Sequence, residues 1–246
     1  MEMKKKLGAL FAALVLGGAV FAENYTKGID LQLGGSIGTT KMKSDLDEIS
    51  GVSVEWTQNI FEGGGHFKIA SYDCFLLNDM LGIYAGLGVN WGAFKTDSDF
   101  SVKIGGTSTT IGSGDSEVNE HGFALSLEFM VGPAFGVDLG GVRFQMGLGF
   151  HGVFAWGWFF GRTDYDDYGS SGRERGKVHY NAFGLAVTPQ FRFGASKRCS
   201  FLLGCDLTFD FPNKLSYEAG KYKMEVEFDK GFRFGAIPYI GLGINF

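Results

Sequence analysis

Apolar residues recur at every second position in eight separate stretches of the chain, each about 9 to 15 residues long. The stretches lie at 29–37, 66–76, 81–91, 123–131, 142–150, 183–193, 201–211 and 232–246, the second being the weakest. A period of two is typical of a β-strand with one apolar face, and this length fits a tilted transmembrane strand. The strongest candidate for a spanning helix, 151–161, is too short and is interrupted by Gly.

The links between these stretches alternate in length. Short links lie at 77–80, 136–141 and 194–200, whereas long polar links occupy 38–62, 96–120, 161–179 and 212–230. Short periplasmic turns and long external loops are the pattern of bacterial barrels, whose strand number is even. The sequence therefore predicts an all-β fold, a closed antiparallel up-and-down transmembrane β-barrel of eight strands. Within the loops, 100–111 is predicted to form a hairpin about Gly105-Gly106, and 221–228 also alternates.

The first 22 residues have the composition of a secretory signal peptide. Three lysines at 4–6 precede an apolar run at 7–21, and cleavage is expected between Ala22 and Glu23. An N-terminal transmembrane helix is the less favoured alternative, because a span needs about 20 apolar residues. The mature domain is then 23–246, and the loss of one Glu and three Lys changes the formal net charge from −5 to −7. This acidic balance makes nucleic acid an unexpected partner.

Composition adds to the barrel prediction. The chain has 40 Gly and 25 Phe, which suits one crowded face and one apolar face. Three cysteines, Cys74, Cys199 and Cys205, are not spaced as metal ligands. They are expected to act as small hydrophobic residues, while a bridge between Cys74 and Cys199 stays open. Aromatic residues at the ends of the strands that face the long loops predict an interfacial girdle; these are Trp91, Phe94, Trp156, Trp158, Phe159, Phe160, Tyr180 and Phe211.

The C-terminal residues carry a resemblance to a known class. Tyr239, Gly241, Ile244 and Phe246 occupy the polar, glycine, hydrophobic and terminal aromatic positions of a segment that resembles the sorting signal of outer-membrane barrels. The eight-run layout resembles the small barrels of the OmpX, OmpA transmembrane, OmpW and Opa-like types. The resemblance implies the cell outer membrane as the location, with outer-membrane lipid and the barrel-assembly machinery as partners. It implies no particular activity.

Alternation places a set of polar residues inside the barrel: Asp30, Glu128, Arg143, Gln145, Gln190, Arg192, Asp206, Asp210 and Arg233. An eight-stranded barrel is just wide enough for side chains to fill it, and buried charges there are expected to pair. Expected depth groups Glu128 with Arg143 and Arg192 in the periplasmic half, and Asp210 with Arg233 in the outer half. A structural plug is the favoured interpretation, and a gated polar path is the alternative.

No motif predicts catalysis, a cofactor or a metal. The run at 147–152 satisfies the dinucleotide pattern G-x-G-x-x-G, but a strand and not a helix is expected to follow it. His121, His151 and His179 lie towards the outer rim without a compact Ser and acid motif beside them, so no enzyme activity is predicted. Asp164, Asp166 and Asp167 could hold a divalent cation, although a solvated acidic loop is the favoured interpretation.

Two functions from different classes follow from these patterns. The first is a structural or surface-interaction barrel that binds extracellular ligands through its long loops, because function on a rigid scaffold usually lies in displayed loops. The second is a narrow channel or transporter for small or hydrophobic solutes, which the glycine-rich lumen favours. The sequence names no ligand for either.

Overall fold

The fold is described from a computed structural model, which describes residues 28–49, 52–77, 80–104, 107–111, 120–163, 172–194, 198–219, 222–227 and 230–245. Every regular element in these ranges is a β-strand. The strands are β1 (Gly28–Ile49), β2 (Val52–Leu76), β3 (Leu81–Ile104), β4 (Thr107–Ile111), β5 (Glu120–Asp138), β6 (Val142–Thr163), β7 (Gly172–Gly194), β8 (Cys199–Ala219), β9 (Tyr222–Glu227) and β10 (Lys230–Asn245).

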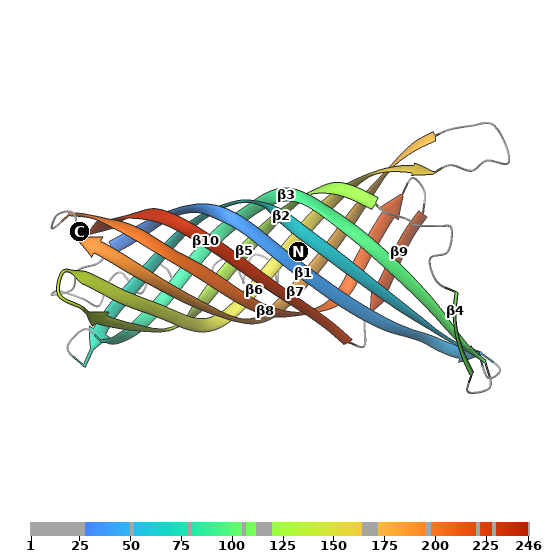
Figure 1. The fold of residues 1–246 in the computed structure, drawn as a ribbon, viewed down its shortest axis with the longest axis horizontal. Helices are drawn as coiled ribbons and strands as arrows, with labels where there is room; N and C mark the ends of the chain where they lie inside the picture. Colours follow the sequence, from blue (N-terminus) through green and yellow to red (C-terminus); the bar gives the residue numbers. More distant parts are fainter. Residues whose placement is uncertain are drawn as a thin grey trace, which may run out of the picture.

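Eight of these strands close into one antiparallel barrel. The circuit runs β1, β2, β3, β5, β6, β7, β8 and β10, and β10 returns to pair with β1 from Gly28 opposite Asn245 to Lys43 opposite Lys230. The strands wind around the cylinder at a common tilt, and β4 and β9 lie at the end away from the C-terminus (Figure 1). Closure leaves no free edge in the wall, so the predicted eight-stranded barrel is confirmed.

The three short turns lie where the sequence placed them, between β2 and β3, β5 and β6, and β7 and β8. In the second turn Gly140 and Gly141 have φ angles of 70° and 101°. Only glycine adopts such angles without strain, and the backbone N–H of Leu139 donates to the carbonyl of Val142 at 2.7 Å across the turn. This end of the barrel carries the C-terminal strand end and is the periplasmic end by the rule of short turns.

Much of the sequence predicted to form long loops is strand instead. The prediction of a loop at 38–62 is wrong: β1 continues to Ile49, and β2 begins at Val52 rather than near His66. Parts of the loops predicted at 96–120, 161–179 and 212–230 likewise continue the neighbouring strands. Outside the lipid the outer face of a strand need not be apolar, so the alternation fades while the backbone ladder continues.

Two hairpin features within those segments were anticipated. Phe100–Ile104 of β3 pairs with Thr107–Ile111 of β4, as the Gly-Gly turn signal indicated. The alternating segment at 221–228 contains β9, which pairs with β8 from Lys214 opposite Glu227 to Ala219 opposite Tyr222. Both hairpins extend the barrel at its external end.

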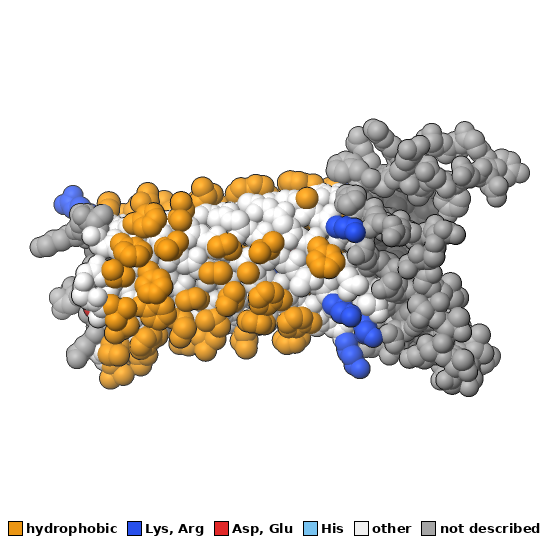
Figure 2. Space-filling view, in the orientation of Figure 1, with side chains coloured by type: hydrophobic (Ala, Val, Ile, Leu, Met, Phe, Trp, Pro, Cys, Tyr) orange, Lys and Arg blue, Asp and Glu red, His pale blue; other side chains and the backbone are white. Residues whose placement is uncertain are grey.

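The outer face of the barrel carries a broad apolar belt (Figure 2). Its exposed side chains include Leu33, Ile37, Phe61, Leu87, Trp91, Phe123, Leu127, Phe150, Trp158, Leu185, Phe209, Phe211, Phe232, Ile240 and Leu242. Exposed apolar surface on this scale marks contact with lipid. In the described ranges no helix is long and apolar enough to cross a membrane.

The predicted aromatic girdle is only partly correct. Trp91, Trp158 and Phe211 are exposed on the outer face, as expected. Phe94 and Tyr180, however, are only 5% exposed and lie in the hydrophobic cluster inside the barrel. Their positions share the parity of the inward residues of β3 and β7, so alternation places them inside although their aromatic character favours the interface.

Candidate functional site in the barrel lumen

The lumen is the place where polar side chains from all parts of the chain meet. Among the predicted lumen residues, Asp30, Gln145, Gln190 and Asp210 are at most 4% exposed. Glu128, Asp206 and Arg233 are also buried, and Arg192 and Arg143 are half-buried towards the periplasmic end. Buried charges need ion-pair or hydrogen-bond partners, and the barrel brings such partners together from distant parts of the sequence.

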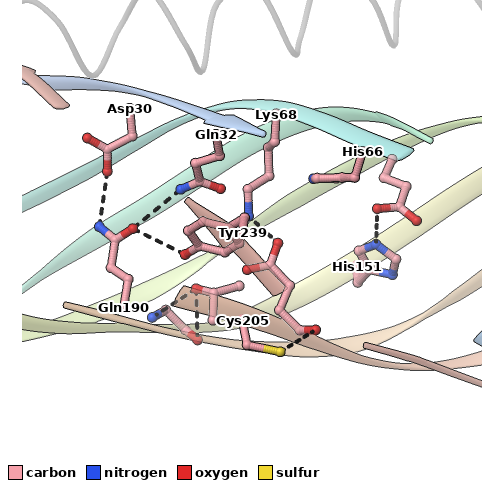
Figure 3. Close-up of polar contacts among 12 residues, drawn as sticks. Asp30, Gln32, His66, Lys68, His151, Gln190, Cys205 and Tyr239 are labelled. Atoms are coloured by element: carbon pink, nitrogen blue, oxygen red, sulfur yellow. Dashed lines mark hydrogen bonds and ion pairs between the residues drawn. The ribbon is translucent and has the colours of Figure 1, made fainter. Parts of the chain in front are cut away.

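At the periplasmic end, the carboxylate of Asp30 is the centre of a hydrogen-bonded layer. It forms an ion pair with Arg192 and accepts a hydrogen bond from the side-chain amide of Gln190 at 3.0 Å. Gln190 also donates to Gln145 at 3.0 Å, and its carbonyl oxygen accepts from the hydroxyl of Tyr239 at 3.2 Å. Figure 3 shows Asp30, Gln190 and Tyr239 approaching one another across the interior. The layer ties β1, β6, β7 and β10 together.

Arg192 also closes the lumen mouth on this side. Its guanidinium donates to the hydroxyl of Ser200 at 3.0 Å, to the side-chain oxygen of Asn245 at 2.9 Å and to Gln145 at 3.1 Å. A guanidinium has five donors in a fixed plane, and here several are satisfied at once. The end of β10 is thereby held to β7 and β8.

Above this layer, two tyrosine rings contact each other at a tilt inside the barrel. The rings of Tyr72 and Tyr84 lie 4.4 Å apart between centroids, and the hydroxyl of Tyr72 donates to the carbonyl of Thr188 at 2.8 Å. Glycine provides the space for them. A Cβ at Gly147 would lie 2.8 Å from Cγ of Tyr84 and 2.7 Å from Oγ1 of Thr188, so any larger residue would collide with both.

A buried lysine forms the next contact. The ammonium of Lys68 pairs with the carboxylate of Asp206, and both side chains are at most 7% exposed. The ammonium also lies 5.5 Å and 5.0 Å from the ring centroids of Tyr84 and Tyr239. The rings attract the cation, so Lys68 connects the aromatic layer to the ionic residues above it.

Arg233 is the centre of a second ionic cluster nearer the external end. Its guanidinium lies 3.0 Å from Asp210, 3.6 Å from Glu128 and 3.4 Å from Glu62. The ring of His151 lies between two of these carboxylates, 2.7 Å from Asp210 and 3.9 Å from Glu128. Five strands contribute one residue each, so this arginine cluster joins much of the barrel wall.

Beyond the arginine cluster, the lumen becomes apolar. The hydroxyl of Tyr180 donates to Glu62 and marks the boundary between the two regions. The apolar cap consists of Met42, Ile60, Phe94, Val153, Ala155, Val178, Tyr180, Ala182 and Leu215. None of these side chains is more than 5% exposed. A layer of this kind excludes water from the external side of the charges.

Two small cavities lie between these layers. One cavity of about 10 Å³ lies beside Lys68, Glu128 and His151, and a second of about 10 Å³ lies within the apolar cap beside Phe94 and Tyr180. A cavity of this size holds about one water molecule. The first cavity adjoins buried oxygen atoms of Glu128 and Asp206 that lack a hydrogen-bond partner in the described part of the chain.

The expected pairings are correct for one group and wrong for another. Asp210 and Arg233 are in contact, as their depth indicated. Glu128, expected beside Arg143 and Arg192, instead lies with Arg233 and His151, while Arg143 bonds to Asp138 at 3.0 Å. The depth expected from the position along each strand was wrong for Glu128, because the strands tilt and are staggered around the barrel. Residues at equal distances from their strand ends can therefore lie at different heights along the barrel axis.

Several residues of the lumen were not in the predicted set. Lys68, His151 and Tyr239 stood at inward positions of recognised runs, so parity alone could have included them. Glu62 lay in a segment predicted as loop. For Glu62, the missing information was the length of β2, which begins at Val52.

The other predicted site residues lie partly on the barrel wall and partly outside the described residues. In the C-terminal segment Tyr239 and Gly241 are on the lumen face, and Ile244 is exposed on the lipid face. Phe246, Ala22 and Glu23 lie outside the described residues, as do Asp164, Asp166 and Asp167. The G-x-G-x-x-G run lies within β6, which continues as a strand to Thr163. Cys74 is half-buried on β2 and Cys199 is exposed on β8.

Comparison with known proteins shows similarity at the level of the fold. No protein-family model matches the chain, and no curated protein matches it in sequence. Among solved structures, the outer membrane protease OmpT from Escherichia coli is 9% identical, with 92% of this chain and 99% of that chain covered and a TM-score of 0.49. A major outer membrane protein from Thermus thermophilus is 13% identical, with coverage of 87% and 99% and a TM-score of 0.48.

The outer membrane protein OprG from Pseudomonas aeruginosa is 16% identical, with coverage of 90% and 97% and a TM-score of 0.38. All three are outer-membrane proteins. For this chain, the closed barrel and the apolar belt indicate an outer-membrane location. Similarity this distant carries no information about activity, so the function has to be judged from the residues of this chain.

Proposed function

We propose that this chain is a closed outer-membrane barrel that acts through its external surface, as a rigid support for extended hairpins that contact other molecules. The observation that carries the proposal is the filled lumen. Two polar layers, a tyrosine layer and an apolar cap follow one another along the axis, and the two cavities within them each hold about 10 Å³. Such an interior supports a structural plug rather than a path for solutes.

The apolar cap is the strongest barrier in this arrangement. An ion that entered from the outside would have to lose its hydration among Met42, Ile60 and Phe94, which are at most 5% exposed. The buried polar side chains beside Ile60 and Phe94, those of Gln58 and Thr96, carry no charge that could replace the lost hydration. Dehydration of a charge in an apolar region is strongly unfavourable, so steady conduction would require the cap to move.

The external hairpins supply the surface for the proposed role. The ladder between β1 and β2 continues past Lys43 opposite Thr57 to Ile49 opposite Val52, and the ladder between β2 and β3 continues to Val52 opposite Ile104. Because the same strands form the barrel wall, their outer ends are held by a hydrogen-bonded scaffold. Binding residues on such a support lose little conformational entropy when a partner docks.

The buried histidine does not support a catalytic alternative. A hydrolase would need a reachable nucleophile beside the imidazole and a substrate position next to both. The contacts described for His151 are to the carboxylates of Asp210 and Glu128, and its side chain is 3% exposed. We therefore propose a structural role for it within the arginine cluster.

Planar-bilayer recording on the refolded mature protein tests the closed lumen. We expect no steady conductance, because the cap and the ionic layers fill the interior. Replacement of three cap residues, Met42→Ala, Ile60→Ala and Phe94→Ala, should introduce conductance, whereas Leu127→Ala on the lipid face should not. Steady conductance of the unchanged protein that is altered by Asp210→Asn would contradict the proposal and favour a narrow channel or transporter for small or hydrophobic solutes.

Shortened hairpins test the surface role. The register allows residues 44–56 to be replaced by Asn-Gly between Lys43 and Thr57, and residues 101–110 to be replaced in the same way between Phe100 and Ile111. Each variant should keep heat-modifiable gel mobility and silent bilayers. Cells that display the unchanged protein should adhere to immobilised matrix proteins more strongly than cells with either shortened form. Equal adhesion by all three would exclude these hairpins as the contact surface.

A further inference from the structure

One of the two lumen cavities borders both ionic groups of the interior. Its lining includes Lys68 and Asp206, which form one ion pair, and Glu128, which belongs to the arginine cluster. Figure 3 shows Lys68 extending from the barrel wall into the interior. The cavity has a volume of about 10 Å³. It is therefore a small space that adjoins charged residues from both groups.

Four of the residues that line this cavity carry a buried oxygen atom without a described hydrogen-bond partner. These atoms are the hydroxyl oxygens of Tyr84 and Thr208, Oε1 of Glu128 and Oδ1 of Asp206. The four residues are 0%, 1%, 6% and 5% exposed, so bulk water does not reach these atoms. A buried polar atom that lacks a hydrogen bond is costly, so all four need a partner within the cavity.

The four oxygen atoms match the hydrogen-bonding capacity of one water molecule. The carboxylate oxygens of Glu128 and Asp206 only accept hydrogen bonds, whereas the hydroxyl groups of Tyr84 and Thr208 can donate. One water molecule would donate to the two carboxylates and accept from the two hydroxyl groups. Buried waters make about three such bonds, and a cavity of about 10 Å³ has room for one.

A metal ion fits this cavity less well than water. The ammonium of Lys68 pairs with Asp206, and the guanidinium of Arg233 lies 3.6 Å from Oε1 of Glu128. Both carboxylates thus have a cation beside them already, and a further cation would be repelled by both. Within the described ranges, no group of three His, Cys, Asp or Glu side chains is arranged to hold a metal ion. These contacts favour a neutral ligand.

Two glycines of β3 keep the space open. A Cβ at Gly86 would lie 2.7 Å from the hydroxyl oxygen of Tyr84, and a Cβ at Gly88 would lie 2.8 Å from Cε1 of His66. Both glycines line the cavity. A larger residue at Gly86 would therefore occupy the space in front of the Tyr84 hydroxyl group.

We propose that this cavity binds one internal water molecule, held by Tyr84, Glu128, Asp206 and Thr208. The water joins the Lys68–Asp206 pair to the arginine cluster in a single hydrogen-bonded network. The apolar cap closes the external side of the lumen, and the tyrosine rings and the Asp30 layer close the periplasmic side. Exchange with bulk water then requires the lumen to open, so the water is long-lived.

Two buried threonines provide the first test. Thr208 lines the cavity, whereas Thr40 is equally buried, has a hydroxyl group without a described partner and lines neither cavity. Thr208→Val removes a hydrogen bond to the water, so the folding equilibrium constant from urea titration should fall by about fivefold. Thr40→Val replaces an unpaired hydroxyl group by a methyl group and should not lower it. Equal results for the two variants would overturn the proposal.

Oxygen-17 relaxation dispersion of water provides the second test, because it counts long-lived internal waters in the refolded protein. Gly86→Ala should lose one such water, whereas Gly194→Ala, where a Cβ meets nothing within 4 Å, should lose none. An unchanged count in Gly86→Ala would overturn the proposal. Heat-modifiable gel mobility checks folding, and the threonine comparison decides alone if Gly86→Ala fails to refold.

The salt used in the urea titration distinguishes water from a cation. With water in the cavity, the urea midpoint should be the same in sodium chloride and in choline chloride at equal ionic strength. A midpoint that is higher in sodium chloride, with the difference lost in Thr208→Val, would show a sodium site and overturn the proposal.

Discussion

Ion pairs occur in two very different regions of this barrel, the lumen and the β8–β9 hairpin. In the lumen, Arg233 and Asp210 pair at 3.0 Å with side chains 5% and 0% exposed. On the hairpin, Lys214 and Glu225 pair at 2.6 Å with side chains 42% and 43% exposed. The distances are similar, but water reaches only the second pair. We therefore expect burial, and not distance, to decide how much each contact contributes to the stability of the fold.

The physical reason lies in what happens when one partner is removed. An exposed carboxylate without its lysine is solvated by water, so little free energy is lost. A buried carboxylate without its arginine remains in a region of low dielectric constant with no replacement partner. The lumen pairs therefore make the barrel intolerant of single changes, although they need not make it more stable than an apolar interior would.

The largest expected effect is that of Arg233→Met. It leaves the carboxylates of Asp210, Glu128 and Glu62 without their shared cation, and the free energy of unfolding should fall by about 4–5 kcal/mol. Urea titration of the protein in phosphatidylcholine vesicles, followed by gel mobility, measures the change. Lys214→Met on the hairpin is the control and should leave the urea midpoint unchanged. Similar midpoint shifts for both variants would remove the distinction between the two regions.

Lys68 gives a simpler test of the buried pairs, because it has one principal partner, Asp206. Lys68→Met should lower the free energy of unfolding by about 3 kcal/mol, since Asp206 is left buried and charged. The double variant Lys68→Met with Asp206→Leu should recover most of this loss, because an apolar pair of similar volume needs no compensation. The same urea titration applies. A double variant that is less stable than the single one would show that the charge pair itself stabilises the barrel.

A smaller effect is expected from packing. Gly147→Ala forces a Cβ to within 2.8 Å of the ring of Tyr84, and the free energy of unfolding should fall by about 1–3 kcal/mol. Gly194→Ala is the matched control, since a Cβ there meets nothing within 4 Å. The urea midpoints of the two variants give the answer. A neutral Gly147→Ala would indicate that the tyrosine layer can shift, and that the lumen is less rigid than its contacts indicate.

The smallest effect is expected on the hairpin. The ammonium groups of Lys214 and Lys223 lower the pKa of the Glu225 carboxyl from 4.5 to about 2. The contribution of these pairs is therefore present above pH 4.5 and is lost as the pH falls towards 2. Because all three side chains are solvated, Glu225→Gln should not change the melting temperature measurably at pH 7 or pH 3. A clear difference at pH 7 that becomes smaller at pH 3 would mean that the hairpin pairs matter to stability.

Parts of the fold and the lumen followed directly from the sequence. Alternation identified all eight barrel strands and gave the correct face for residues such as Asp30, Glu128 and Leu33, because the side-chain period of a strand is fixed at two. It failed at the external ends, where β1 continues to Ile49 without an apolar outer face. Lipid imposes the pattern that the sequence displays, so a strand that leaves the lipid loses its signature.

What the sequence determined by itself was the barrel, its eight membrane strands and the side of the wall on which each of their residues lies. What only the tertiary structure decided was which inward residues meet. Arg233 joins Glu62, Glu128 and Asp210 from three other strands, and Glu128 lies with His151 rather than with Arg143. Face depends on local backbone geometry, whereas contact across the lumen depends on the stagger and tilt of the closed barrel, which are properties of all the strands together.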